Sequence, residues 1–297
     1  AAALTLAVCL VIAGLSARTL GTVGARVAAA TARAPGEVIS ARDRTAEVRW
    51  QAPGGQRIDI VELATRAPPA GTRTEVAYDP ANPAGALIPG STELAAVDRA
   101  ASGVAFSALI AVLVAATFGW QLISRRRLGA REAQVLPVRR VRVQSGLLTR
   151  SWLEIETERS PRWIPVHFDP VLLTLPAPAP VLMHGDPYRH RLVAVEVDGS
   201  WLYPSGPVRT SEPTGRRIDS PARPDNDMAP GDTAPDAARC GWRRQLQADA
   251  VLLTPAPIVG LLWVFLDDGG VLTWAGATAL AAALGVCRAA LRGSDPS

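Results

Sequence analysis

Residues 100–127 have the sequence AASGVAFSALIAVLVAATFGWQLISRRR, and no charged side chain lies between positions 101 and 123. An apolar helix of this length crosses about 30 Å of hydrocarbon. Arg125, Arg126 and Arg127 follow directly, and arginines beside a transmembrane helix favour the cytoplasmic side of the membrane. This stretch therefore predicts a transmembrane helix, residues 101–123, whose C-terminal end is cytoplasmic.

Three other apolar stretches follow the same pattern. They lie at residues 1–17, 250–266 and 271–291. The alternative for the first stretch is a signal peptide cleaved near residues 28–30. A retained helix is favoured because it places all the arginine-rich helix ends on one side of the membrane. Pro255 and Pro257 are expected to bend the third helix near its start. We expect an integral membrane α-helical protein with four transmembrane helices, located in the plasma membrane with both termini cytoplasmic.

The segment between the first two helices, residues 35–90, predicts a small all-β module on the external side. Short runs rich in Val and Ile lie at residues 37–40, 46–50, 57–63 and 73–78. Clusters of proline and glycine supply turns between these runs. Polar and apolar side chains alternate in RIDIVEL, residues 57–63, so one face is buried and the other is wet. A meander or small barrel of four or five strands is expected.

The same segment resembles a known family. Its features are Gly36-Glu37-Val38, a strand pair around Trp50 and Gly55, and the block VAYDPANP at residues 76–83, all between two helices. Over residues 1–125 this arrangement resembles the bacterial membrane family called domain of unknown function 3592. The resemblance implies a membrane-tethered β domain and no established activity.

Tyr78, Asp79 and Asn82 in that block have two interpretations. Asp79 and Asn82 each stand directly before a proline. Asp and Asn at such positions close turns through hydrogen bonds from the side chain to the backbone, which favours a rigid exit into the second helix. The alternative is a binding rim formed by Tyr78, Asp79 and Asn82.

A second all-β module is predicted at residues 135–204, on the cytoplasmic side. Its expected strands are residues 135–143, 152–157, 162–166, 180–184, 192–197 and 201–203. Asp198-Gly199 between the last two is a hairpin signal, and a barrel-like module of five to seven strands is expected. Residues 205–238 are rich in Pro, Gly, Ser, Asp and Arg, which predicts a disordered linker.

All three histidines, His167, His184 and His190, fall in the second module. His184, Asp186 and His190 lie close together in the sequence, so a metal site is conceivable there. Their spacing matches no standard ligand pattern, and ordinary surface histidines are favoured. Trp201 is a candidate binding platform, although tryptophans in β modules more often pack than bind.

The sequence contains no catalytic signature. It has no G-x-S-x-G motif, no paired cysteines at metal-ligand spacing and no glycine-rich phosphate loop with a lysine. The high pI, near 9.5, reflects arginines near the helix ends rather than a nucleic-acid partner. Neither catalytic residues nor a cofactor is predicted.

These observations favour a non-enzymatic multi-pass membrane scaffold or interaction protein. Its expected partners are the lipid bilayer and other membrane or envelope proteins. The alternative is an accessory subunit of a transporter or membrane protease, in which Gly260 and the small-residue face of the fourth helix let helices approach closely. A metal-dependent enzyme built on His184, Asp186 and His190 is a third and more distant hypothesis.

Overall fold

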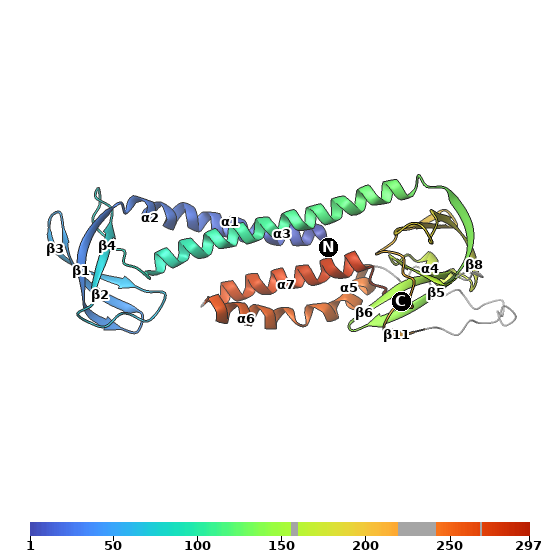
Figure 1. The fold of residues 1–297 in the computed structure, drawn as a ribbon. Coiled ribbons are helices and arrows are strands. Elements are labelled where there is room, and N and C mark those ends of the chain that lie inside the picture. Colours follow the sequence, from blue (N-terminus) through green and yellow to red (C-terminus); the bar gives the residue numbers. More distant parts are fainter. Residues whose placement is uncertain (156–159, 219–241, 268) are drawn as a thin grey trace. The chain divides into compact units, whose positions relative to one another are not determined.

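The structure is a computed structural model that describes residues 1–155, 160–218, 242–267 and 269–297. It contains two compact units, one of residues 6–113 and one of residues 1–5 with 114–297. Each unit combines apolar helices with one antiparallel sheet (Figure 1).

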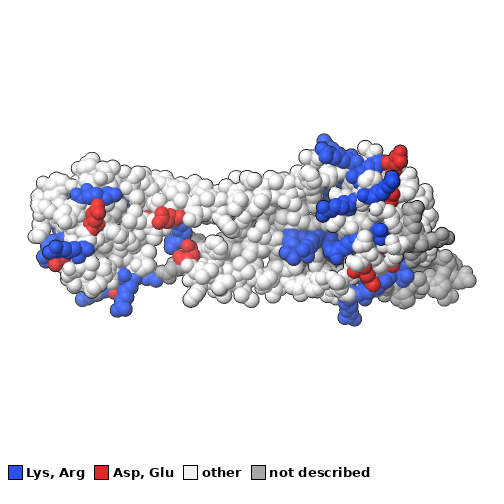
Figure 2. Space-filling view, viewed as in Figure 1, with Lys and Arg blue, Asp and Glu red and all other residues white. Residues whose placement is uncertain are grey.

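Four helical segments among the described residues are long and apolar enough to cross a membrane. They are Ala2–Ala29, Thr92–Leu128, Gln247–Asp267 and Val271–Arg292. They overlap all four predicted stretches, and each ends later in the chain than predicted. Large apolar side chains on them are exposed, including Phe265 at 84% and Leu272 at 88%. On the face drawn in Figure 2, charged side chains gather over the strands and few lie over the apolar helices. Exposed apolar surface of this extent is typical of a membrane or protein contact.

These spans are built from regular helices with two interruptions. The helices are, in chain order, α1 (Ala2–Thr19), the π-helix η1 (Leu20–Gly24), α2 (Ala25–Ala29), α3 (Thr92–Leu128), α5 (Trp242–Ala250), the 3-10 helix η4 (Val251–Leu253), α6 (Ala256–Asp267) and α7 (Val271–Arg292). Pro255 lies in the break between η4 and α6. The sequence predicts a bend at Pro255 and Pro257. The structure has a break at Pro255, where proline lacks the N–H of a helical hydrogen bond, whereas Pro257 lies within α6.

The first sheet has four antiparallel strands in the order β3-β2-β1-β4. The strands are β1 (Ala32–Arg42), β2 (Thr45–Ala52), β3 (Gly55–Glu62) and β4 (Arg73–Tyr78). They overlap the four predicted runs, but β4 pairs with β1 and not with β3, so the sheet is not a simple meander. Every second residue of β2 from Ala46 to Ala52 is buried, as the period of a strand requires.

The alternation in the sequence of β3 predicted one buried face but not which of the two faces it is. Val61 and Leu63 are buried, whereas Ile58 and Ile60 are 57% and 71% exposed. Asp59 accepts a 2.8 Å hydrogen bond from the indole N–H of Trp50, a core residue. This bond holds the Asp59 side of the strand toward the core, because residues two apart share a face.

The second sheet curls into a half-barrel. Its strands are β5 (Ala133–Ser145), β6 (Leu148–Ile155), β7 (Arg162–Val166), β8 (Ala179–His184), β9 (Ala194–Val197), β10 (Ser200–Leu202) and β11 (Arg216–Arg217), and the short helix α4 (Val171–Thr174) follows β7. The order is β10-β9-β8-β5-β6-β7, with β11 on β5. Bridges from Trp163 to Arg209 and from Val166 to Pro204 join β7 to the chain that leaves β10. The strands overlap the six predicted runs, and residues 156–157 of the second run lie outside the described residues.

The predicted disordered linker, residues 205–238, is wrong over residues 205–218, which follow β10. Arg209 and Trp163 exchange backbone hydrogen bonds of 3.0 and 2.8 Å, and β11 pairs with β5. Residues 205–218 therefore belong to the half-barrel. Their polar composition did not indicate this pairing, because the hydrogen bonds that hold them join backbone groups. Residues 219–238 lie outside the described part of the chain.

Both faces of β6 are covered. Leu153 belongs to the core cluster of the half-barrel, and Trp152 packs with Trp163 in a second cluster. Successive side chains of a strand point to opposite faces, so Ser151 lies on the core side and Arg150 on the opposite side. These two faces carry the two polar sites of the half-barrel.

Candidate functional site

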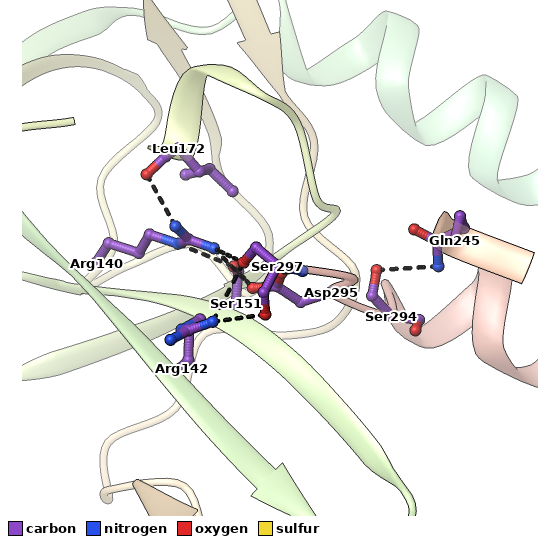
Figure 3. Close-up of polar contacts among 8 residues, drawn as sticks. All are labelled: Arg140, Arg142, Ser151, Leu172, Gln245, Ser294, Asp295 and Ser297. Carbon is purple, nitrogen blue, oxygen red and sulfur yellow. Dashed lines mark hydrogen bonds and ion pairs between the residues drawn. The ribbon is translucent and has the colours of Figure 1, made fainter. Parts of the chain in front are cut away.

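A buried polar cluster joins the chain after α7 to strands β5 and β6 (Figure 3). Asp295 Oδ2 lies 2.8 Å from Arg140 Nη2 and accepts a 2.6 Å hydrogen bond from Ser151 Oγ. The Asp295 side chain is fully buried, and that of Arg140 is 14% exposed. Arg140, Ser151, Asp295 and Ser297 together are named the tail-docking cluster.

A glycine turn brings Asp295 to the sheet. Gly293 adopts a left-handed conformation with φ of 69° and donates its N–H to the Ala289 carbonyl, a common helix ending that favours glycine. Ser294 then forms a β-bridge with Arg150, and the Asp295 N–H donates to the Thr149 carbonyl at 2.9 Å. The chain thus leaves α7 as a short extended segment paired with β6.

Further hydrogen bonds complete the cluster. Arg140 donates to the Leu172 carbonyl at 3.1 Å and to Ser297 Oγ at 2.8 Å. Arg142 donates to the Ser297 carbonyl at 2.6 Å. Ser297 donates to Asp295 Oδ1 from its hydroxyl and its N–H, at 2.6 and 2.9 Å. Both carboxylate oxygens therefore have donors, which a buried ion pair needs to offset its lost hydration.

Opposing effects set the charge state of Asp295. Burial alone would raise the pKa of this carboxyl group, but the Arg140 charge and hydrogen bonds from Ser151 and Ser297 outweigh it and lower the pKa below its ordinary value. Asp295 is therefore ionised at neutral pH, and the cluster holds a true ion pair.

Helix α5 also reaches the tail. Gln245 Nε2 donates to the Ser294 carbonyl at 3.4 Å and to Asp249 Oδ2 at 3.1 Å (Figure 3 shows the first of these bonds). The segment after α7 thus contacts the strands that follow α3 and the helix that precedes the third span. Three separate stretches of the chain meet at one point.

His167, directly after β7, is a half-buried titratable residue. Its Nε2 atom has no hydrogen-bond partner among the described residues. Burial, followed by the positive charges of Arg125 and Arg150, lowers the pKa of His167 to about 4. The imidazole is therefore neutral at pH 7.

Of the metal candidates, Asp186 and His190 contact each other, whereas His184 contacts a neighbouring strand. His184 Nε2 lies 3.1 Å from Glu196 Oε2 on the neighbouring strand β9. His190 Nδ1 accepts the N–H of Asp186 at 3.0 Å, and Asp186 Oδ1 accepts the N–H of Tyr188 at 2.8 Å. Within the described ranges, no three His, Cys, Asp or Glu side chains form a group that could hold a metal ion.

Trp201 lies half-buried on β10 in a row of rings. Its ring centroid is 4.4 Å from that of His184 and 6.1 Å from that of Tyr203. The guanidinium of Arg125 lies over the Tyr203 ring at 5.0 Å. Trp201 therefore packs between two rings, and a ligand-binding role for it stays a prediction.

Tyr78, Asp79 and Asn82 have three different surroundings in the first sheet's unit. Tyr78 packs on Trp50 with ring centroids 4.9 Å apart. Asp79 Oδ1 accepts the Ala81 N–H at 2.8 Å, which confirms the predicted turn. Asn82 is exposed. A binding rim formed by these residues stays a prediction.

Sequence reasoning missed the tail-docking cluster entirely. Arg140 and Asp295 are far apart in the chain, and neither belongs to a motif. The one local signal is the polar segment Ser294-Asp295-Pro296-Ser297 directly after an apolar span and a glycine. That pattern indicates a helix end but gives no partner for the aspartate.

Comparison of the chain with protein-family models, with curated proteins and with solved structures gives no match. Among the residues that the structure describes, the class of chain is defined by four helices long and apolar enough to cross a membrane and by two antiparallel sheets. The resemblance of residues 1–125 to domain of unknown function 3592 stays a prediction. The function is therefore argued from the geometry.

Asp295→Asn should release the tail from the half-barrel. The buried Arg140 charge loses its carboxylate, and breaking a buried ion pair from one side costs about 3–5 kcal/mol. Hydrogen exchange at the amide of residue 295, which is bonded to the Thr149 carbonyl, should become much faster in the variant. In the wild type the folded-state pKa is lowered, so protection should persist at neutral pH and be lost only as the pH falls below the ordinary value of 3.8.

The matched control is Glu75→Gln, which removes an exposed ion pair with Arg33, 54% and 65% exposed. Exposed pairs contribute about 0–1 kcal/mol, so this variant should keep the wild-type exchange rates. Unchanged protection at residue 295 in Asp295→Asn would show that the ion pair does not hold the tail.

His167→Gln should remove a specific acid sensitivity. The folded-state pKa of about 4 lies below the ordinary 6.5, so the neutral imidazole contributes full stability above pH 6.5 and progressively less toward pH 4. The wild type should lose on the order of 2–3 kcal/mol of unfolding free energy across that interval. Chemical denaturation at several pH values measures this. The control variant His190→Gln, at an exposed residue, should keep the wild-type dependence of unfolding free energy on pH. If His167→Gln keeps it too, another group causes the acid sensitivity.

Proposed function

We propose that the protein is a non-enzymatic multi-pass scaffold of the plasma membrane, inserted through its four apolar helices. The observation that carries the proposal is the tail-docking cluster, where a buried ion pair holds the chain after α7 against β5 and β6. A soluble module tied to its membrane helices in this way presents a fixed surface to partners. Preorganised surfaces of this kind lower the entropy cost of binding.

In the proposed topology the half-barrel and both termini are cytoplasmic, and the first sheet is external. The support is the position of the arginines. Arg125, Arg126 and Arg127 occupy the last turn of α3, and Arg292 occupies the last turn of α7. Arginines at helix ends retain those ends in the cytoplasm during insertion.

Cysteine labelling in intact cells tests this topology. In a background lacking Cys9, Cys240 and Cys287, Ile60→Cys and Leu147→Cys place single thiols at positions 71% and 58% exposed. A membrane-impermeant maleimide should label Ile60→Cys in intact cells and Leu147→Cys only after permeabilisation. Labelling of both from the same side would contradict the topology, and labelling of both after denaturation is the control for expression.

An accessory subunit of a transporter or membrane protease is the second candidate. The observation that favours it is a free small-residue patch on α7. An added Cβ at Gly276 would meet no described atom within 4 Å, and Ala279 is exposed. By contrast, Gly260 of α6 lies against Thr278 and Trp274 of α7 and already serves packing within the chain. Small residues let membrane helices approach closely, so the free patch suits a helix of another protein.

Photocrosslinking in native membranes separates the two candidates. A photoreactive residue at Leu147, in the turn between β5 and β6, should capture partners of a scaffold. The same residue at Ala279 should capture a membrane helix if the protein is an accessory subunit. Adducts from position 147 but not 279 support the scaffold, and the reverse pattern supports the subunit. Adducts only between copies of this chain at both positions would contradict both proposals.

A further inference from the structure

A pocket of about 210 Å³ opens on the face of the half-barrel opposite the core. Arg150 and Trp152 of β6, Arg209 of the segment after β10 and Arg292 at the end of α7 line it. Ser205 and Thr214 also line it. We call this the arginine pocket. Three arginines are among its lining residues, and no Asp or Glu is among the described ones.

The guanidinium groups of Arg150 and Arg209 contact neutral partners. Arg150 donates from Nε to the Arg292 carbonyl at 2.7 Å and from Nη2 to Ser205 Oγ at 3.1 Å. Arg150 and Arg209 lie over the same Trp152 ring, 5.0 and 5.3 Å from its centroid. In the part of the chain that the structure describes, none of the three arginines is paired with a carboxylate.

This concentration of like charge is unfavourable without an anion. Burial, followed by repulsion from Arg292 and Arg209, lowers the pKa of Arg150 to about 10. Arg150 still carries its charge at neutral pH, so the three positive charges coexist there. Asp295, Glu154 and Glu212 are engaged in other ion pairs, Asp295 with Arg140 and both glutamates with Arg217. An arrangement of this kind is typical of binding sites more than of structural ion pairs.

We propose that the arginine pocket binds a phosphate group. Guanidinium groups present paired N–H donors that match phosphate oxygens, and the pocket adds hydroxyl donors at Ser205 and Thr214. The Trp152 ring keeps the Arg150 and Arg209 planes in place, so little side-chain entropy is lost on binding. The phosphate can belong to a lipid head group or to a soluble molecule. The first source rests on the proposed membrane insertion, because Arg292 ends the apolar helix α7.

The primary test uses the full chain purified in detergent, with inorganic phosphate as the probe. Phosphate should raise the midpoint of thermal unfolding above that in chloride of matched ionic strength. Arg209→Gln should weaken the apparent affinity by roughly tenfold or more, because a hydrogen bond to a charged group is lost. Arg209 is exposed and its side chain contacts only the Trp152 ring among the described contacts, so this variant should fold. Arg191→Gln, an exposed arginine outside the pocket, should bind phosphate like the wild type.

A second arm identifies the source of the phosphate. The protein is reconstituted into bilayers of phosphatidylcholine containing phosphatidic acid, and lipids that stay bound are identified by native mass spectrometry. Retention of phosphatidic acid by the wild type but not by Arg209→Gln or Arg292→Gln supports a lipid head group. Phosphate-dependent stabilisation without selective lipid retention supports a soluble ligand.

Equal behaviour of the wild type, Arg209→Gln and Arg292→Gln in both arms would overturn the proposal. The detergent arm does not depend on how the helices are oriented. A failure of phosphate binding is therefore distinguishable from a failure of the proposed topology, which the cysteine labelling reports.

Discussion

The structure of the larger unit depends on one buried ion pair, Arg140 with Asp295. Removing two charges from water is costly, and the pair is favourable only if its geometry is good and its remaining donors and acceptors are satisfied. Ser151 and Ser297 supply hydrogen bonds to both oxygens of the carboxylate, and the Leu172 carbonyl accepts from Arg140. The observed position of the tail against β5 and β6 meets these conditions. The chain leaving α7 is therefore fixed in register against the half-barrel, which an apolar contact alone would specify less strictly.

The two polar sites are joined through the same short stretch of backbone. Arg292 contributes its carbonyl to Arg150 Nε, and Ser294, two residues later, bridges to Arg150 before Asp295 enters the tail-docking cluster. Strand β6 presents Ser151 to one site and Arg150 to the other, on opposite faces. Because Arg150 contacts both Arg292 and Ser294, we propose that an anion in the arginine pocket favours the docked tail, and by thermodynamic reciprocity docking then favours anion binding.

Much of the secondary structure could be predicted from local patterns, and the contacts that organise it could not. Apolar length located the four helices, and Val-rich runs bounded by turn residues located the strands. The buried face of β3 was not predictable, because either phase of the strand buries two apolar side chains, Ile58 with Ile60 or Val61 with Leu63. The structure buries the second pair, on the side where Asp59 accepts the bond from Trp50. Residues 205–218 were assigned to a linker because backbone pairing to β7 leaves no trace in composition. The tail-docking cluster joins residues distant in the chain, and such a pairing is visible only in three dimensions.

Arginines at the helix ends support the proposed topology and also contact the half-barrel. In the proposed topology, Arg125 and Arg292 keep the ends of α3 and α7 in the cytoplasm by the charge rule for membrane insertion. The same two residues contact the half-barrel, Arg125 through the Tyr203 ring and Arg292 through its carbonyl to Arg150. An inverted α7 would carry its end away from strands that remain on the other side, and Asp295 would have no arginine to pair with. In the proposed topology, docking of the tail therefore requires that the ends of α3 and α7 lie on the same side of the membrane as the half-barrel.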